Sequence, residues 1–350
     1  MYFFQLLTYL SIILFTVSCT NQNEDSRNFE FTYQINLQPS NQKVELWFPI
    51  PRSNEVQEIT RLSLQPGFLS CEELIESVHL NHYYYCYIDE GLLEPMTLSY
   101  VVNVRRFEHG GTNYNNLNPD NYDQGTNHMT VPEGDIFSDI LLDYNLTPKN
   151  INSVYKYVLN GMHYGKPKSK KNIYYSNPWL SEDGLYGKKK VSRDEVVKLY
   201  QDSKITGSNY TFGQGNAVYA CDIGVGNCTD YHSYFMSLSR TLEVPTRFHM
   251  GFPIPLENEG TVSGYHCWAD YYVEGEGWYP VDISEADKHK EKSDYFFGTV
   301  GKNRVELMVG RDFILEGYGE GTVNLFIYPL LEIDDAPSTS FTKYFSYKNI

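Results

Sequence analysis

Residues 226–252, GNCTDYHSYFMSLSRTLEVPTRFHMGF, constrain the fold of this chain more than any other stretch. Asn227 belongs to the residue types that favour the N-cap of a helix, and Cys228 then takes the first helical position. Pro245 cannot continue a helix, so we expect the helix to end before it and a strand to follow over about 246–252. The helical spacing places four apolar side chains in one buried stripe, namely Tyr231, Phe235, Leu238 and Leu242.

The N-terminal part of the chain alternates apolar and polar residues with a period of two, which is typical of half-buried strands. Four such runs predict a small antiparallel β-sandwich over residues 28–107. A stretch rich in Gly and Asn follows, and it predicts a linker over residues 108–147. The four strand-like runs cover residues 29–35, 44–50, 83–88 and 98–104.

After the linker the pattern changes to helices and then back to strands. Thr147 and Pro148 favour a helix start, and apolar residues between Ile151 and Met162 fall on one helical face. Ser192 favours the start of another short helix. The fold class is therefore α+β, with helices before an antiparallel sheet in the second half. The strands of that sheet are predicted at about 246–252, 265–273 and 278–283.

The charge of the chain argues against one class of partner. The formal net charge is −16 and the isoelectric point is near 5.0. A phosphate backbone would be repelled by such a surface, so we expect no nucleic-acid partner.

Residues 1–19 have the pattern of an export signal, with an apolar run that ends in small residues and Cys19. The tail TVSC resembles the lipobox of bacterial lipoproteins, in which this cysteine is lipidated. This pattern predicts an exported protein, in the periplasm or at the outer membrane or cell surface, held to the membrane by an N-terminal lipid anchor. Plain secretion and an uncleaved membrane anchor are the alternatives.

Cys228 has the placement of a reactive thiol, because the partial positive charge of a helix N-terminus stabilises a thiolate. His266 and Asp282 lie on consecutive strands, and a hairpin turning at about 274–277 would bring them within a few positions of register. The three residues predict a cysteine, histidine and carboxylate constellation. A buried structural thiol is one alternative, and a zinc site is another. The zinc ligands would be Cys228, His232, His266 and Cys267, although no close CxxC or HExxH spacing occurs.

These segments resemble the transglutaminase-like superfamily, whose core is a papain-like fold. The motifs GNCTDYHSYFMSLSRTLEVPTRF, GYHCWADYY and GWYPVDIS carry the resemblance, together with the spacing of Arg240, Pro245 and Arg247. The resemblance implies a catalytic domain over residues 148–300. It also implies the sandwich in front and a β-rich C-terminal extension over 301–350, which bacterial exported members carry.

The resemblance further implies an enzyme that acts on amide bonds of proteins or peptides through a thioester. Cys228 would attack the acyl carbon, His266 would move the proton and Asp282 would orient His266. We expect hydrolysis, as by a peptidase or amidase, with protein cross-linking and a non-catalytic binding scaffold as alternatives. No cofactor or metal is expected. The oxyanion donors would be the Cys228 N–H and a side chain, with Gln214 and Tyr219 as candidates.

The number of cysteines suggests two disulfides. If Cys19 is lipidated and Cys228 stays free for catalysis, four cysteines remain. Cys71 and Cys86 both lie in the predicted sandwich, which makes them the first candidate pair. The second candidate pair joins the two catalytic motifs, through Cys221 and Cys267.

Overall fold

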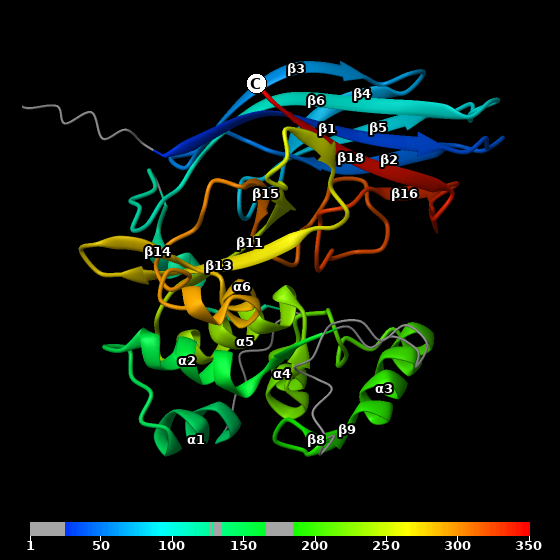
Figure 1. The fold of residues 1–350 in the computed structure, drawn as a ribbon. Coiled ribbons are helices and arrows are strands. Elements are labelled where there is room, and N and C mark those ends of the chain that lie inside the picture. The colour runs from blue at the N-terminus through cyan, green and yellow to red at the C-terminus, as the bar shows by residue number, and fades with distance from the viewer. Residues whose placement is uncertain (1–24, 116, 127, 129–134, 166–184) are drawn as a thin grey trace, which may run out of the picture.

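The computed structural model describes residues 25–350, except 116, 127, 129–134 and 166–184. It is a mixed fold of helices and mainly antiparallel sheets. Figure 1 shows strands gathered on one side, helices on the other, and a short sheet between them. No helix within the described ranges is long and apolar enough to cross a membrane. The predicted export signal and Cys19 lie outside the described residues.

Two five-stranded antiparallel sheets form the strand-rich side of the molecule. The first has the order β12-β18-β1-β6-β3, and the second has the order β17-β16-β2-β5-β4. The strands of the first sheet are β1 (Ser26–Leu37), β3 (Gln57–Gln65), β6 (Met96–Phe107), β12 (Glu259–Thr261) and β18 (Phe341–Asn349). Those of the second are β2 (Val44–Ile50), β4 (Ser70–Ile75), β5 (His82–Ile88), β16 (Leu330–Ile333) and β17 (Ala336–Ser338).

The core between these sheets follows from the alternation in the sequence. On β1 every second side chain from Phe29 to Leu37 is buried. Tyr33 packs edge-on against Phe48 of the second sheet, with ring centroids 5.7 Å apart. Strand β2 is buried along its whole length, because the chain after β15 (Arg304–Val309) covers its other face. That cover is fixed by the Trp47 indole, which donates to the Glu316 carbonyl at 2.8 Å.

The C-terminal strands complete the sheets that the N-terminal strands begin. Strand β18 pairs with β1, and β16 pairs with β2. Sequence analysis assigned residues 301–350 to an extension of their own, but the structure inserts these strands beside the first two strands of the chain. Because a strand edge leaves N–H and C=O groups unpaired, β1 over 29–37 and β2 over 44–47 gain partners from the far end of the sequence.

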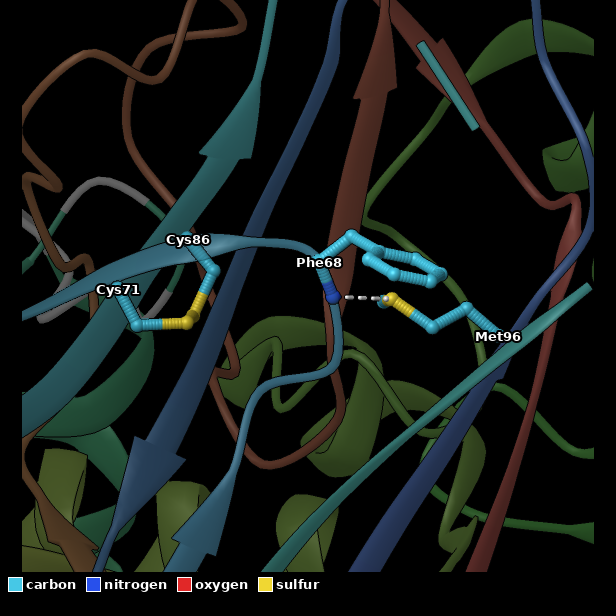
Figure 2. Close-up of a disulfide and its surroundings, with 4 residues drawn as sticks. All are labelled: Phe68, Cys71, Cys86 and Met96. Carbon is cyan, nitrogen blue, oxygen red and sulfur yellow. Dashed lines mark hydrogen bonds between the residues drawn. A yellow bond between two sulfur atoms is a disulfide. The ribbon is translucent and has the colours of Figure 1, made fainter. Parts of the chain in front are cut away.

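A disulfide joins Cys71 on β4 to Cys86 on β5 (Figure 2). The two residues lie directly opposite each other in the register of the strands. Beside them, the Phe68 N–H donates to the Met96 sulfur at 3.2 Å, which fixes the turn before β4 to β6. The structure thus contains the first predicted cysteine pair.

The remaining sheet and the helices form the other half of the molecule. The sheet has the order β14-β13-β11-β15, and the buried helix α5 (Cys228–Thr241) packs against β13 and β11. The new strands are β11 (Thr246–Pro253), β13 (His266–Val273) and β14 (Gly277–Val281). The other helices are α1 (Asp135–Asp143), α2 (Ile151–Gly161), α3 (Arg193–Thr206), α4 (Ala217–Ile223) and α6 (Ile283–Lys288). Short elements are β7 (His163–Tyr164), β8 (Leu185–Tyr186), β9 (Val191–Ser192), β10 (Val225–Gly226) and the 3-10 turns Pro119–Tyr122 and Lys290–Lys292.

Of the two predicted helix starts in this half, Ser192 is confirmed, whereas the start at Thr147 and Pro148 is wrong because α2 begins at Ile151 after Asn150. Ser192 caps α3, since its hydroxyl accepts from the Glu195 N–H at 3.4 Å and the Glu195 carboxylate accepts from the Ser192 N–H at 2.7 Å. Helix α2 begins at Ile151 and buries the predicted apolar face. The papain-like fold of the catalytic domain remains a prediction.

Candidate active site

Helix α5 begins at Cys228 because the preceding residue caps it. The Asn227 side chain accepts from the Thr229 N–H at 2.9 Å, and the Asp230 carboxylate accepts from the Asn227 N–H at 3.0 Å. This reciprocal arrangement satisfies the first free N–H groups of the helix. Among the described residues, none accepts a hydrogen bond from the Cys228 N–H. The thiol therefore lies at the positive end of α5, beside an N–H that can serve an oxyanion.

Asp230 ties the loop before α4 to the start of α5. Its carboxylate accepts from the Gly213 N–H at 2.8 Å and from the Gly215 N–H at 3.0 Å. Burial raises the pKa of Asp230 to about 7, although these N–H donors act in the opposite direction. A β-carbon on Gly226 would lie 2.5 Å from that of Asp230, so the residue two before the nucleophile must be glycine. Asp230 thus has a structural role beyond stabilising the helix N-terminus.

His266 and Asp282 meet as the predicted hairpin requires. Strands β13 and β14 pair with Ala269 opposite Val281, which brings the start of β13 beside the residue that follows β14. The His266 Nε2 lies 2.8 Å from Asp282 Oδ2, so Nδ1 is the ring nitrogen that faces Cys228. All three side chains are shielded from water, with exposed fractions of 3% for Cys228, 6% for His266 and 0% for Asp282.

The charges of these groups support one another. Hydrogen bonds from Cys267 and His266 outweigh burial and hold the pKa of the Cys228 thiol well below its usual value. Burial lowers the pKa of His266, but the Asp282 carboxylate and the Cys228 sulfur outweigh it and raise that pKa to about 9. Both shifts favour a thiolate and an imidazolium over two neutral groups, and this charged pair is the reactive form of a cysteine nucleophile.

Arg304 is a further partner of Asp282. Its Nη1 donates to Asp282 Oδ2 at 3.1 Å, and its guanidinium lies 4.7 Å from the ring centroid of Trp268. The other carboxylate oxygen accepts from the Glu285 N–H at 3.2 Å and from the Ser284 hydroxyl at 3.3 Å. The pKa of Asp282 lies well below its ordinary value, since the charges of His266 and Arg304 outweigh its burial. Sequence analysis alone could not pair this arginine with one acidic residue.

His232 links the first residue of α5 to the first residue of α6. Its Nδ1–H donates to the Cys228 carbonyl at 2.6 Å, and its Nε2 accepts from the Ile283 N–H at 3.0 Å. This pattern fixes one neutral tautomer, and burial lowers the pKa of His232 to about 4. Both ring nitrogens are thus occupied by the backbone, which argues against His232 as a zinc ligand.

The two side-chain candidates for the oxyanion site have other partners. Tyr219 is fully buried, and its hydroxyl donates to the Val225 carbonyl at 3.0 Å. Gln214 is exposed, and its side-chain oxygen accepts from Asn324 at 3.3 Å. The Tyr219 hydroxyl is engaged as a donor, whereas the Gln214 contact uses its oxygen and not its NH₂ group, so the Gln214 side chain and the Cys228 N–H stay the predicted donors.

The second predicted disulfide is absent, because Cys221 and Cys267 are both free thiols. Cys221 is hydrogen-bonded to Tyr234, whereas the Cys267 sulfur lies 3.7 Å from the Thr229 hydroxyl. These two partners, Tyr234 and Thr229, lie five positions apart on α5, which is roughly 140° around a helix. The prediction of this pair was wrong because the helix separates the two sulfurs.

The comparison with known families concerns the stretch that contains the three predicted catalytic residues. The family model described as the transglutaminase-like superfamily matches residues 182–283, which include Cys228, His266 and Asp282. The chain carries a transglutaminase-like domain. An uncharacterized protein from Haemophilus influenzae is 30% identical over 43% of this chain and 50% of its own length. This chain therefore spans about half of that curated relative.

Two solved structures are similar to the transglutaminase-like chain at low identity. One comes from Cytophaga hutchinsonii and is named as a candidate cysteine protease. It is 13% identical, covers 93% of this chain and 98% of its own, and has a TM-score of 0.49. The other is the periplasmic domain of TgpA from Pseudomonas aeruginosa. It is 14% identical, covers 76% of this chain and 73% of its own, and has a TM-score of 0.33.

Proposed function

We propose that this protein is a cysteine hydrolase that cleaves amide bonds of peptides or proteins. The observation that carries the proposal is the buried Cys228, His266 and Asp282 arrangement at the N-terminus of α5. The Cys228 thiolate attacks the amide carbon, and the Cys228 N–H donates to the oxygen that becomes negative. The His266 imidazolium gives its proton to the departing amine, which leaves an acyl thioester on Cys228.

Hydrolysis of that thioester completes the cycle. His266, now neutral, takes a proton from water as the water oxygen attacks the thioester carbon. The carboxylic acid then leaves, and Cys228 recovers the sulfur electrons as a thiolate beside the imidazolium. Asp282 holds the ring in one orientation through both steps, with Nε2 bound and Nδ1 toward the sulfur.

Water is the proposed acceptor rather than a lysine amine. A cross-linking enzyme needs its thioester enclosed by an aromatic tunnel until the amine arrives. The two tryptophans near the site are Trp268 and Trp278, which are 1% and 2% exposed. Trp268 stacks on His249 and Trp278 packs against Tyr272, so both serve the core. Their burial supports hydrolysis over cross-linking.

The proposal includes export from the cytoplasm. The apolar run and small residues before Cys19 form the signal, and Cys19 is the proposed lipid-anchored residue. The disulfide between Cys71 and Cys86 supports this location, since such bonds persist in oxidising compartments. The partners would be a protein or peptide substrate and a membrane that holds the lipid anchor.

The test compares Cys228→Ala and His266→Ala with wild type on a library of peptide amides. Cys221→Ala is the matched control, because it removes a buried thiol of α4 that contacts Tyr234 on another face of α5. We expect peptide or ammonia release from wild type and the control, and none from the two variants, with unchanged circular dichroism. A labelled primary amine is added in parallel. Amine incorporation faster than hydrolysis would support cross-linking, and an unreactive Cys228 with no product would support a binding scaffold.

A further inference from the structure

A series of polar side chains leads from the half-buried Tyr265 toward the Cys228 sulfur. The Tyr265 hydroxyl lies 3.2 Å from the Thr229 hydroxyl, and the Thr229 hydroxyl lies 3.7 Å from the Cys267 sulfur. Thr229 directly follows Cys228, and the Cys267 and Cys228 thiols lie within interaction range, since each shifts the pKa of the other. Thr229 and Cys267 are both fully buried, so no water competes for these contacts. These contacts connect the first turn of α5 with Cys267, the second residue of β13, and with Tyr265 just before the strand.

The direction of the hydrogen bonds follows from the charge at the end of this series. A thiolate can only accept, so the Cys267 thiol must donate to Cys228 and must itself carry a proton. Burial raises the pKa of Cys267 well above its ordinary value, and the nearby Cys228 sulfur acts in the same direction. Thr229 can then donate to Cys267, and Tyr265 can donate to Thr229. Each hydrogen bond in this series is then donated in the direction of Cys228.

The site needs such a donor because it excludes the solvent that would otherwise stabilise the thiolate. An unpaired charge in a buried position is expensive unless hydrogen bonds compensate for it. We propose that Cys267 is a positioning residue of the proposed hydrolase, whose thiol donates a hydrogen bond to the Cys228 thiolate and stabilises it before acyl transfer. This inference rests on the proposed function only for its catalytic consequence, since the hydrogen bond can be tested without a substrate.

Other titratable groups also surround the two sulfurs, and a pH experiment must account for them. They do not replace Cys267, because Cys267 has the largest single effect that lowers the pKa of Cys228. These groups are Asp230 and His232 on α5, Tyr265 and His266 at the start of β13, Asp282 and Lys288 at α6, and Arg311 and Tyr328 after β15.

The first experiment measures alkylation of Cys228 by iodoacetamide from about pH 4 to about pH 10, with the labelled peptide identified by mass spectrometry. Cys267→Ala removes the donor, Cys267→Ser keeps a hydroxyl donor, and Cys221→Ala is the control. We expect Cys267→Ala to move the midpoint to higher pH and to slow alkylation near pH 6 about tenfold. Cys267→Ser should recover part of the loss, and the control should match wild type.

A merely structural role would give a different result. Loss of packing alone would lower the melting temperature and change the rate at all pH values, without moving the midpoint. An unchanged midpoint in a folded Cys267→Ala would therefore overturn the proposal. Phenylarsine oxide provides a second arm, because its arsenic binds two adjacent thiols and releases one water. It should block Cys228 in wild type and be removed by a dithiol, whereas either Cys267 variant should resist it. Failure to block the wild type would also overturn the proposal.

The outcome is separable from that of the proposed function. If peptide amides are not cleaved but the alkylation midpoint moves as expected, the hydrogen bond stands and the hydrolase proposal fails. If peptides are cleaved and the midpoint does not depend on Cys267, only the positioning role fails.

Discussion

Replacing Asp282 with Asn is the most informative single change at the site, because it removes a charge and leaves the shape almost unchanged. The carboxylate contacts His266 at 2.8 Å and Arg304 at 3.1 Å, and it is fully buried. An amide can still occupy this space, but it cannot neutralise the two cations. Asp282→Asn should therefore affect both the reactivity of Cys228 and the stability of the fold.

The size of both effects can be estimated from the structure. The pKa of His266 stands at about 9 rather than at its ordinary value of about 6.5, which corresponds to about 3 kcal/mol of added preference for the imidazolium. If Asp282→Asn removes most of this preference for the imidazolium and no longer fixes the tautomer of His266, turnover should fall about 10³- to 10⁴-fold. Asp282 is the one ion-pair partner that the described residues give Arg304, which is 7% exposed. Leaving that guanidinium unpaired should cost about 3–5 kcal/mol of unfolding free energy.

The assay separates these two effects with a second substitution. Asp282→Asn combined with Arg304→Met removes the orphaned charge, and this double variant should regain stability in urea unfolding while its turnover of p-nitrophenyl acetate stays low. Alkylation of Cys228 near pH 6 should be slow in both variants. If the double variant is as stable as wild type and keeps more than about a tenth of wild-type turnover, the assignment of Asp282 as the orienting carboxylate is wrong.

Three further predictions concern the pH profile, the disulfide and His232. Turnover should fall as pH rises through about 9, where His266 loses the proton that the leaving group needs, and a pH–rate profile with an alkaline limb near 6.5 would contradict this. Replacing Cys71 and Cys86 together with Ser should lower the unfolding free energy by about 3 kcal/mol for a loop of 15 residues, measured against wild type with the disulfide intact, and reduced wild type should match the variant. His232→Ala should cost about 2 kcal/mol or more in urea unfolding, because the Cys228 carbonyl and the Ile283 N–H lose their buried partner, and His232→Gln should recover part of it.

Local features of the site could be predicted from the sequence because they depend on neighbouring residues. Asn227 caps α5, Cys228 follows it, and the turn at 274–277 forms the β13–β14 hairpin. Each of these depends on a few adjacent residues whose preferences agree with one another. The proximity of His266 and Asp282 then follows from strand pairing, which a short turn determines. Their catalytic roles stay predictions.

Features that depend on distant residues could not be predicted. The alternation in β1 reveals its buried face, but it does not reveal that residues 341–349 pair with it. The same limit applies to Arg304, whose partner lies on another element, and to the cysteines. Cys267 belongs to the His motif, and its position next to His266 suggested a disulfide with Cys221 rather than a contact with Cys228. Only the placement of α5 between the sulfurs decides between these two possibilities.

Strand β15 connects the active site to the N-terminal sheets. Strand β15 carries Arg304, which contacts Asp282, and two residues later Glu306, on the same face of the strand. The Glu306 backbone and side chain accept from Gln57 at 2.9 Å and from Asn54 at 2.8 Å. Gln57 is fully buried, so its removal would leave buried polar groups on β15 without partners. The hydrogen bonds that hold β15 and its Arg304 in place therefore extend across the predicted boundary at residue 148 into the N-terminal sheets.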